Sequence, residues 1–134
     1  MAGLRLGKSG SEPDIRAQLE NPMNSLRDAL RQFAAERDWD QFHSPKNLAI
    51  ALSVEASELL EHFQWLTEDQ SSELPPEKRA EVRDEMADVL LYLVRLADKL
   101  DVDLLDAAAK KIAKNAQKYP ATQVRGSMKK YTDY

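Results

Sequence analysis

The sequence predicts an all-α fold resembling a four-helix bundle. Apolar residues recur every three or four positions through most of residues 24–118, which is the period of an α-helix with one buried face. No segment keeps the alternation of apolar and polar residues that is typical of a strand. Prolines and capping residues fall where the periodic segments stop, so the boundaries agree with the pattern.

The first helix is expected to start at Asn24 or Ser25, either of which can cap it, and to run to about Trp39. One of its faces carries the apolar side chains Leu26, Leu30 and Phe33. The segment DWDQFHSPKN interrupts the pattern. Ser44 is then a suitable N-cap and Pro45 suits the first position of a second helix, which is expected to reach about Leu66.

Two further helices are expected after the polar loop TEDQSSELPP. The third runs from about Glu77 to Leu100 and ends in a turn over residues 101–103. Asp103 can cap the fourth, which continues to Lys118 before Pro120 stops it.

The domain organisation predicted from these segments is simple. Residues 1–22 hold three of the four glycines without sustained periodicity, so we expect a flexible leader. Residues 23–120 form the all-α domain, and the basic tail 121–134 is expected to be irregular. One domain suits a chain of 134 residues.

Composition narrows the functional classes. A net charge of −4 argues against a protein that binds nucleic-acid polymers, because such binding normally needs a basic surface. No apolar run approaches the roughly 20 residues of a membrane span. The absence of cysteine excludes disulfides and thiolate metal sites, and it is compatible with the cytoplasmic location that we expect.

Two helices carry acidic residues where apolar ones are expected. At about 100° per residue, Glu55 lies in the middle of the second helix's apolar stripe, within about 60° of Leu48, Leu52, Leu59 and Leu66. Glu58 lies one turn later. The third helix repeats the arrangement with Glu85 and Asp88, and Glu85 is surrounded by Val82, Val89, Leu93 and Leu96. A short loop favours antiparallel packing, which brings the four carboxylates together.

Four buried carboxylates need cations. Burying even one unpaired carboxylate costs on the order of several kcal/mol, which is a large part of the net stability of a small domain. On a helical wheel Arg83 and Arg95 point away from the centre of the stripe, so a divalent cation is the simpler partner. A site that offers only oxygen ligands favours Mg²⁺, with Mn²⁺ as a substitute.

Two other groups admit more than one interpretation. Lys111, Asn115 and Lys118 share a face of the fourth helix, where they can bind phosphate or remain solvated near the helix C-terminus. The aromatic residues Trp39, Phe42, His43 and Trp65 can form a nucleobase pocket or take part in ordinary packing.

The residues resemble a known family. ERDWDQFHSPKNLAIALSVEASELLEHFQW, followed by DEMADVLLYLVRLADKLDVDLLDAAAKKIAKNAQKYP, is similar to the MazG-like all-α nucleoside triphosphate pyrophosphohydrolases, and most similar to their dCTP pyrophosphatase branch. The family pattern E-x-x-E followed by E-x-x-D is met by Glu55, Glu58, Glu85 and Asp88. The motifs DWDQFH, FQW and NAQKYP, in this order, make the resemblance specific.

The resemblance implies hydrolysis of a nucleoside triphosphate to the monophosphate and pyrophosphate, with Mg²⁺ held by the four carboxylates. It implies that Lys111 and Asn115 contact phosphate or sugar, that Tyr92 lies beside the site, and that the base pocket is lined by Trp39, His43 and Trp65. It also implies a homotetramer built as a dimer of dimers. In the dCTP branch a histidine of the first helix is associated with base recognition, and here that position is Leu30.

Two alternatives stay open from the residues. One is a non-catalytic, homo-oligomeric helical scaffold whose acidic seam binds metal. The other is a house-cleaning hydrolase that acts on other non-standard nucleoside triphosphates.

Overall fold

The computed structural model describes residues 22–130 and 132, and within them every regular element is a helix. This confirms the all-α class. The predicted leader lies outside the described residues except for Pro22, which begins the first helix. The elements are α1 (Pro22–Glu36), the 3-10 helix η2 (Asp40–Phe42), α2 (Pro45–Glu61), α3 (Glu68–Ser72), α4 (Pro76–Lys99), α5 (Leu104–Lys118) and α6 (Ala121–Val124).

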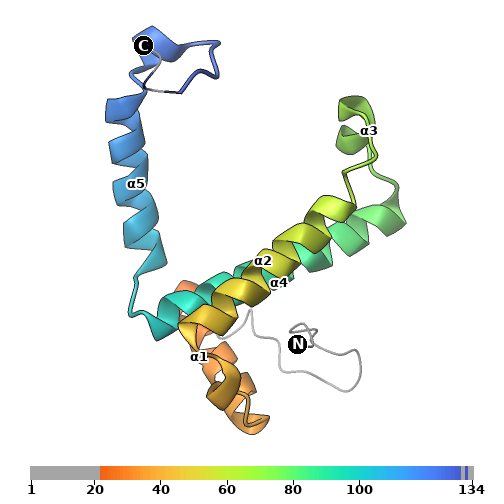
Figure 1. The fold of residues 1–134 in the computed structure, drawn as a ribbon, viewed down its shortest axis with the longest axis vertical. Helices are drawn as coiled ribbons and strands as arrows, with labels where there is room; N and C mark the ends of the chain where they lie inside the picture. Colours follow the sequence, from red (N-terminus) through yellow and green to blue (C-terminus); the bar gives the residue numbers. More distant parts are fainter. Residues whose placement is uncertain (1–21, 131, 133–134) are drawn as a thin grey trace. The chain divides into compact units, whose positions relative to one another are not determined.

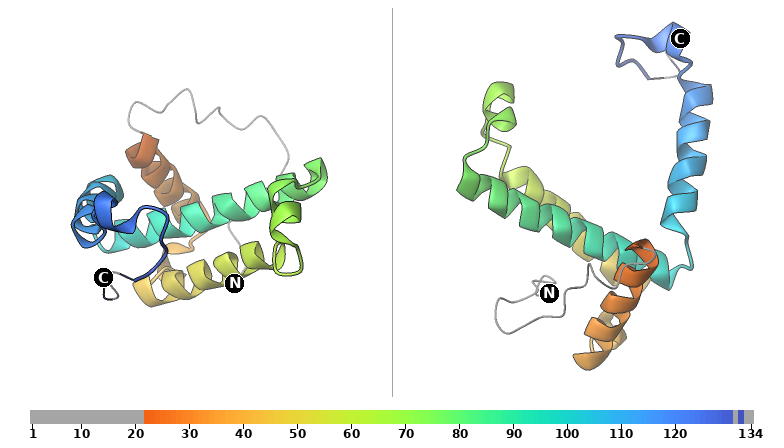
Figure 2. Two further views of the ribbon diagram at one scale, coloured as in Figure 1. Left: turned by 90° about the horizontal axis from the view of Figure 1, so that it is seen from above. Right: turned by 180° about the vertical axis from the view of Figure 1, so that it is seen from behind.

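The chain divides into two compact units, one through Asp101 and one from Val102. In the first unit α2 and α4 lie side by side, and α3 lies in the connection between them (Figure 1). Helix α1 packs against α4, as the two further views show (Figure 2). The second unit contains α5 and α6. The candidate carboxylates therefore all lie in the first unit.

The predicted start of α2 is confirmed. Ser44 has an extended backbone, and its hydroxyl accepts a hydrogen bond from the amide of Asn47 at 3.2 Å. Pro45 occupies the first helical turn, where its missing N–H costs nothing. The helix ends at Glu61 rather than near Leu66, because the chain tightens into turns that include a bond from the Leu66 amide to the Phe63 carbonyl.

The segment predicted to be an irregular loop contains α3. Thr67 caps this helix, and a reciprocal pair of bonds joins Thr67 and Gln70 in a capping box. The T-x-x-Q spacing is a sequence signal for this helix that the apolar pattern did not include. Helix α4 then begins at Pro76, close to the predicted start at Glu77.

Both predicted ends of α1 need correction. Asn24 and Ser25 lie inside the helix, which starts at Pro22. It ends at Glu36 because Asp38 takes a left-handed conformation, with φ of 52°. The Trp39 amide donates to the Ala34 carbonyl at 2.9 Å, and the Asp38 amide donates to Ala35 at 3.2 Å. This is the Schellman pattern of a helix end, with aspartate where glycine is usual.

The core of the first unit lies between α1, α2 and α4. Its buried apolar residues are Leu30, Ala34, Leu48, Ala51, Val82, Leu91, Tyr92, Val94 and Ala97. Polar residues are buried among them, including Glu55, Asp88, His43 and Arg95. Arg95, predicted to point away from the centre of the apolar stripe, is nevertheless buried, at 4% exposure. Near the C-terminal end of α4, Arg95 is bound by Asp40 of η2 and by His43, which follows η2, and it also pairs with Asp98 of its own helix.

The second unit agrees with the predicted fourth helix. The Asp103 carboxylate accepts from the Asp106 amide at 3.0 Å, and α5 ends at Lys118. The tail was expected to be irregular, but a short helix, α6, follows Pro120. Within residues 22–130, no helix combines the length and apolar composition that a membrane span requires.

Candidate active site

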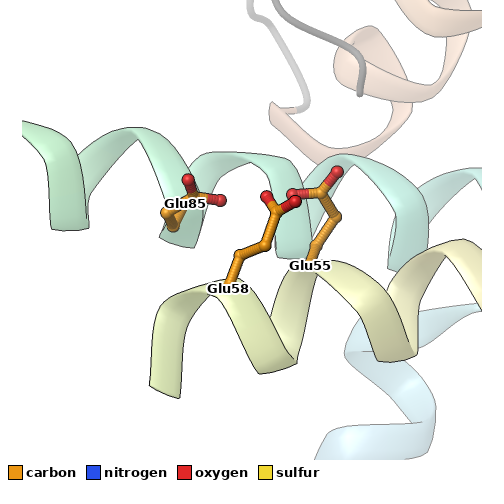
Figure 3. A group of neighbouring side chains, drawn as sticks. All are labelled: Glu55, Glu58 and Glu85. Carbon is orange, nitrogen blue, oxygen red and sulfur yellow. The ribbon is translucent and has the colours of Figure 1, made fainter. Parts of the chain in front are cut away.

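Three glutamates converge between α2 and α4. Glu55 and Glu58 extend from α2 toward Glu85 on α4 (Figure 3). One carboxylate oxygen from each lies within 4.8 Å of the other two. Asp88 follows Glu85 by one turn and is 6% exposed, and its charge acts on both Glu55 and Glu85. Three of the four predicted carboxylates therefore converge, and Asp88 lies one turn along α4 from Glu85.

The glutamates are placed here by the helical period. Because Glu55 lies in the apolar stripe of α2, packing that buries Leu48 and Ala51 also buries Glu55, which is 5% exposed. The Oε2 atoms of Glu55 and Glu85 are buried and have no hydrogen-bond partner in the described part of the chain. Such atoms cost on the order of 1–3 kcal/mol each when they remain unpaired.

Burial and mutual repulsion change the acidity of the cluster. The pKa of Glu55 is raised from 4.5 to about 7. Burial is the largest cause, and the hydrogen bond and charge of Glu58 and the charge of Asp88 add to it. Burial and the charge of Glu58 likewise raise the pKa of Glu85 above its usual value. At neutral pH and without a cation, the cluster therefore retains protons that exposed carboxylates would lose.

This donor set fits a divalent cation. The buried Oε2 atoms are oriented inward, all donors are oxygen, and a cation would remove both the repulsion and the unsatisfied hydrogen bonding. Hard cations such as Mg²⁺ and Mn²⁺ take such ligands. The residues that would hold the ion are Glu55, Glu58, Glu85 and Asp88.

An aromatic group lies where the end of α1 leads into η2. Trp39 packs edge-on against Phe33, with ring centroids 5.7 Å apart, and against His43 at 6.5 Å. The helix end at Asp38 sets the direction of Trp39, since a Schellman motif commonly brings such a residue back onto the helix. His43 is 6% exposed, and its Nδ1 accepts a hydrogen bond from Arg95 Nε at 3.2 Å.

Arg95 is a residue of this region that the sequence reasoning missed. It also forms ion pairs with Asp40 and Asp98. Asp40 and His43 lie more than 50 positions away in the chain. No local spacing pattern links residues at such a separation, so the helical wheel could not reveal this contact.

The remaining predicted residues differ in their surroundings. Tyr92 is 2% exposed on α4, one turn after Asp88. Trp65 lies in the turns after α2 and is 87% exposed, so the described residues leave its indole open to solvent. Lys111 and Asn115 are exposed on α5, in the second unit. Their contact with phosphate or sugar, and a role for Trp65 beside the base, stay predictions.

Comparisons with known proteins agree with the geometry. A model of the MazG-like family matches residues 50–134. The chain is 45% identical over 127 residues to dCTP pyrophosphatase 1 of Mus musculus, covering 93% of this chain and 75% of that protein. Over 116 residues it is 44% identical to dCTP pyrophosphatase 1 of Homo sapiens, covering 85% and 68%. The crystal structure of a pyrophosphatase from Archaeoglobus fulgidus has a TM-score of 0.71 and 38% identity, covering 84% of this chain and 99% of that one.

Proposed function

The chain belongs to the MazG-like family and is a nucleotide pyrophosphatase, and we propose that it converts dCTP, or a dCTP with a modified cytosine, to the monophosphate and pyrophosphate with Mg²⁺. The observation that carries this proposal is the cluster of Glu55, Glu58 and Glu85, in which one buried oxygen of Glu55 and one of Glu85 lack partners. A bound cation would offset the cost of this arrangement, and the pyrophosphatase relatives favour an enzyme over a scaffold that only binds metal.

The four carboxylates have two tasks in this proposal. Glu55, Glu58, Glu85 and Asp88 would hold the cation and would orient the water that attacks the triphosphate. When bound, a divalent cation neutralises charge on the phosphate oxygens and lowers the pKa of coordinated water. As the water oxygen bonds to phosphorus and the anhydride bond breaks, one glutamate accepts the proton, and pyrophosphate leaves.

The substrate proposal rests on the aromatic group and on the relatives. Trp39 and Trp65 supply faces on which a base can stack, and His43 can hydrogen-bond to the base edge. Tyr92 is proposed to lie beside the carboxylates, and Lys111 and Asn115 are proposed to contact phosphate or sugar. Leu30, where a histidine is expected for cytosine recognition, is buried in the core at 6% exposure. This difference is the reason for including modified and non-standard bases.

We extend the proposal to a homotetramer. The first unit exposes apolar side chains on α2 and α4, among them Ile50, Val54, Met86 and Leu90, and α5 exposes Leu105 and Ile112. Apolar surface of this extent is typical of subunit interfaces. Light scattering on a size-exclusion column would give the mass directly, and a monomer would contradict this part. A cytoplasmic location stays a prediction.

The test of the function is a substrate panel. Purified protein is incubated with Mg²⁺ and each common dNTP, with modified dCTPs and with other non-standard nucleoside triphosphates, and released pyrophosphate is measured. We expect the highest kcat/KM for dCTP or a modified dCTP. Preference for another non-standard base would favour the house-cleaning alternative. Release from no nucleotide would contradict the proposed reaction.

A further inference from the structure

A buried arginine–histidine pair lies where η2 meets α4. Arg95 and His43 are 4% and 6% exposed, and Arg95 Nε donates to His43 Nδ1 at 3.2 Å. Arginine remains buried only when its donors are satisfied. The guanidinium group meets this condition through Asp40 and Asp98 in addition to His43.

This contact determines which ring nitrogen of His43 carries the proton. A guanidinium group has only N–H donors and stays protonated in proteins. Nδ1 must therefore be the acceptor, with its lone pair toward Arg95. In a neutral ring the single proton then lies on Nε2. A protonated ring would direct an N–H toward another N–H, so the same contact disfavours the imidazolium form.

Burial and the positive charges around the ring also disfavour the imidazolium form of His43. Burial, then Arg95 and Lys99 on α4, lower the pKa of His43, and Asp40 on η2 opposes them. Asp40 is itself paired with Arg95 and Lys99. Asp98 is paired with Arg31 of α1 and with Arg95, so Asp40 is the carboxylate of this cluster that favours a charged His43, and burial and the two cations outweigh it.

The second ring nitrogen of His43, Nε2, is in a different environment. Nε2 of His43 makes no hydrogen bond to any of the described residues. It is not one of the fully buried unpaired atoms either, so it remains accessible. Trp39 lies beside the ring. An open pocket of about 340 Å³ lies on the α1 side of the cluster, but its cations are already paired with Asp40 and Asp98. The group that is available for a ligand is therefore the Nε2–H of His43.

We propose that Arg95 is a positioning residue that holds His43 as the neutral Nε2–H tautomer, so that this ring presents a hydrogen-bond donor to the nucleobase. The proposal rests on the proposed function, in which His43 borders the base. It predicts that the base faces His43 with an acceptor, a carbonyl oxygen or an unprotonated ring nitrogen. An exocyclic amino group at that position would place two donors face to face and would be rejected.

The first test reads the tautomer without any substrate. The chain has two histidines, so long-range ¹H–¹⁵N correlation spectra resolve both rings, and His62 serves as the internal reference. We expect His43 at pH 7 to show an unprotonated Nδ1 and a protonated Nε2. Any other tautomer in the unmodified protein would overturn the proposal, and this result does not depend on whether a variant folds.

Two variants then separate the effect of the Arg95 hydrogen bond on His43 from the effect of a nearby positive charge. In Arg95→Met we expect His43 to become a mixture of tautomers and to titrate at higher pH. Lys99→Met is the matched control, because it removes a cation of the same cluster that makes no hydrogen bond to His43. It should preserve the Nε2–H tautomer. Equal tautomer changes in both variants would overturn a specific role for Arg95.

Kinetics connect the tautomer to recognition. On the best substrate of the panel, Arg95→Met should raise KM by about tenfold, the loss expected for one hydrogen bond, with kcat little changed. Arg95→Lys, which keeps a donor and a charge, should recover part of the loss. If the tautomer is lost while KM stays unchanged, His43 does not read the base and the proposal is wrong. If no nucleotide is hydrolysed at all, the proposed function fails, and the spectra still decide the tautomer.

Discussion

Replacing Glu55 with glutamine should stabilise the metal-free protein while abolishing hydrolysis. Glutamine has nearly the same shape, so the helix and its packing remain, but the buried charge is removed. Raising a pKa from 4.5 to about 7 corresponds to about 3 kcal/mol against the charged form, at about 1.4 kcal/mol per pH unit. This figure is an upper bound for the gain, because Glu58 and Glu85 share the repulsion.

The sign of the pH dependence follows from proton binding. Between about pH 4.5 and 7 the folded protein holds the Glu55 proton more tightly than the unfolded chain, so stability falls as pH rises through this window. Below pH 4.5 both states are protonated and the penalty disappears. With a chelator present, Glu55→Gln should therefore have a larger free energy of unfolding than the parent by up to about 3 kcal/mol at pH 8 and by less than about 1 kcal/mol at pH 5.

The assay is urea denaturation at both pH values, with chelator and with saturating Mg²⁺. Glu61→Gln, an exposed change at the end of the same helix, is the matched control and should shift stability little. Mg²⁺ should stabilise the parent more than Glu55→Gln, because the ion binds the folded parent through one more carboxylate. An equal or lower stability of Glu55→Gln at pH 8 without metal would refute the account of buried repulsion. Near-normal turnover at saturating Mg²⁺ would refute the role of Glu55 in catalysis.

Substitutions at four further positions test the fold and the base pocket. Trp39→Ala and Trp65→Ala should each raise KM for the nucleotide by about tenfold or more, because each removes a ring on which the base stacks. Mg²⁺ affinity, measured by calorimetry, should change little. If KM is unchanged in both variants, these residues serve in packing and not in base binding. In urea denaturation, Asp38→Gly should be neutral or stabilising and Asp38→Ala should lower the free energy of unfolding by about 1 kcal/mol. The reason is that φ of 52° strains a residue with a Cβ atom. The reverse order of stability would contradict the proposed helix end. Asp103→Ala should cost about 1 kcal/mol and reduce helix content by circular dichroism, since it removes the cap of α5, and an unchanged melting curve would show that this cap is dispensable.

The carboxylate site was predictable because its signal is periodic. Glu55 and Glu85 each occupy the centre of a predicted apolar stripe, so packing of α2 against α4 buries Glu55 and partly covers Glu85. Caps were predictable for the same local reason, since Ser44 and Asp103 bond to amides three residues away. The misplaced ends of α1 and α2 depended on backbone turns that apolar spacing does not encode.

Other features depended on tertiary packing. Arg95 lies away from the centre of the apolar stripe of α4, and only tertiary packing buries it and provides Asp40 and His43 as partners, in addition to Asp98 one turn along the same helix. The solvent exposure of Trp65 likewise follows from where α2 ends. By itself the sequence determined that helices would bring acids together, because period and capping act over a few residues. The tautomer of His43 was decided only in the folded protein, because its donor lies 52 residues away in the chain.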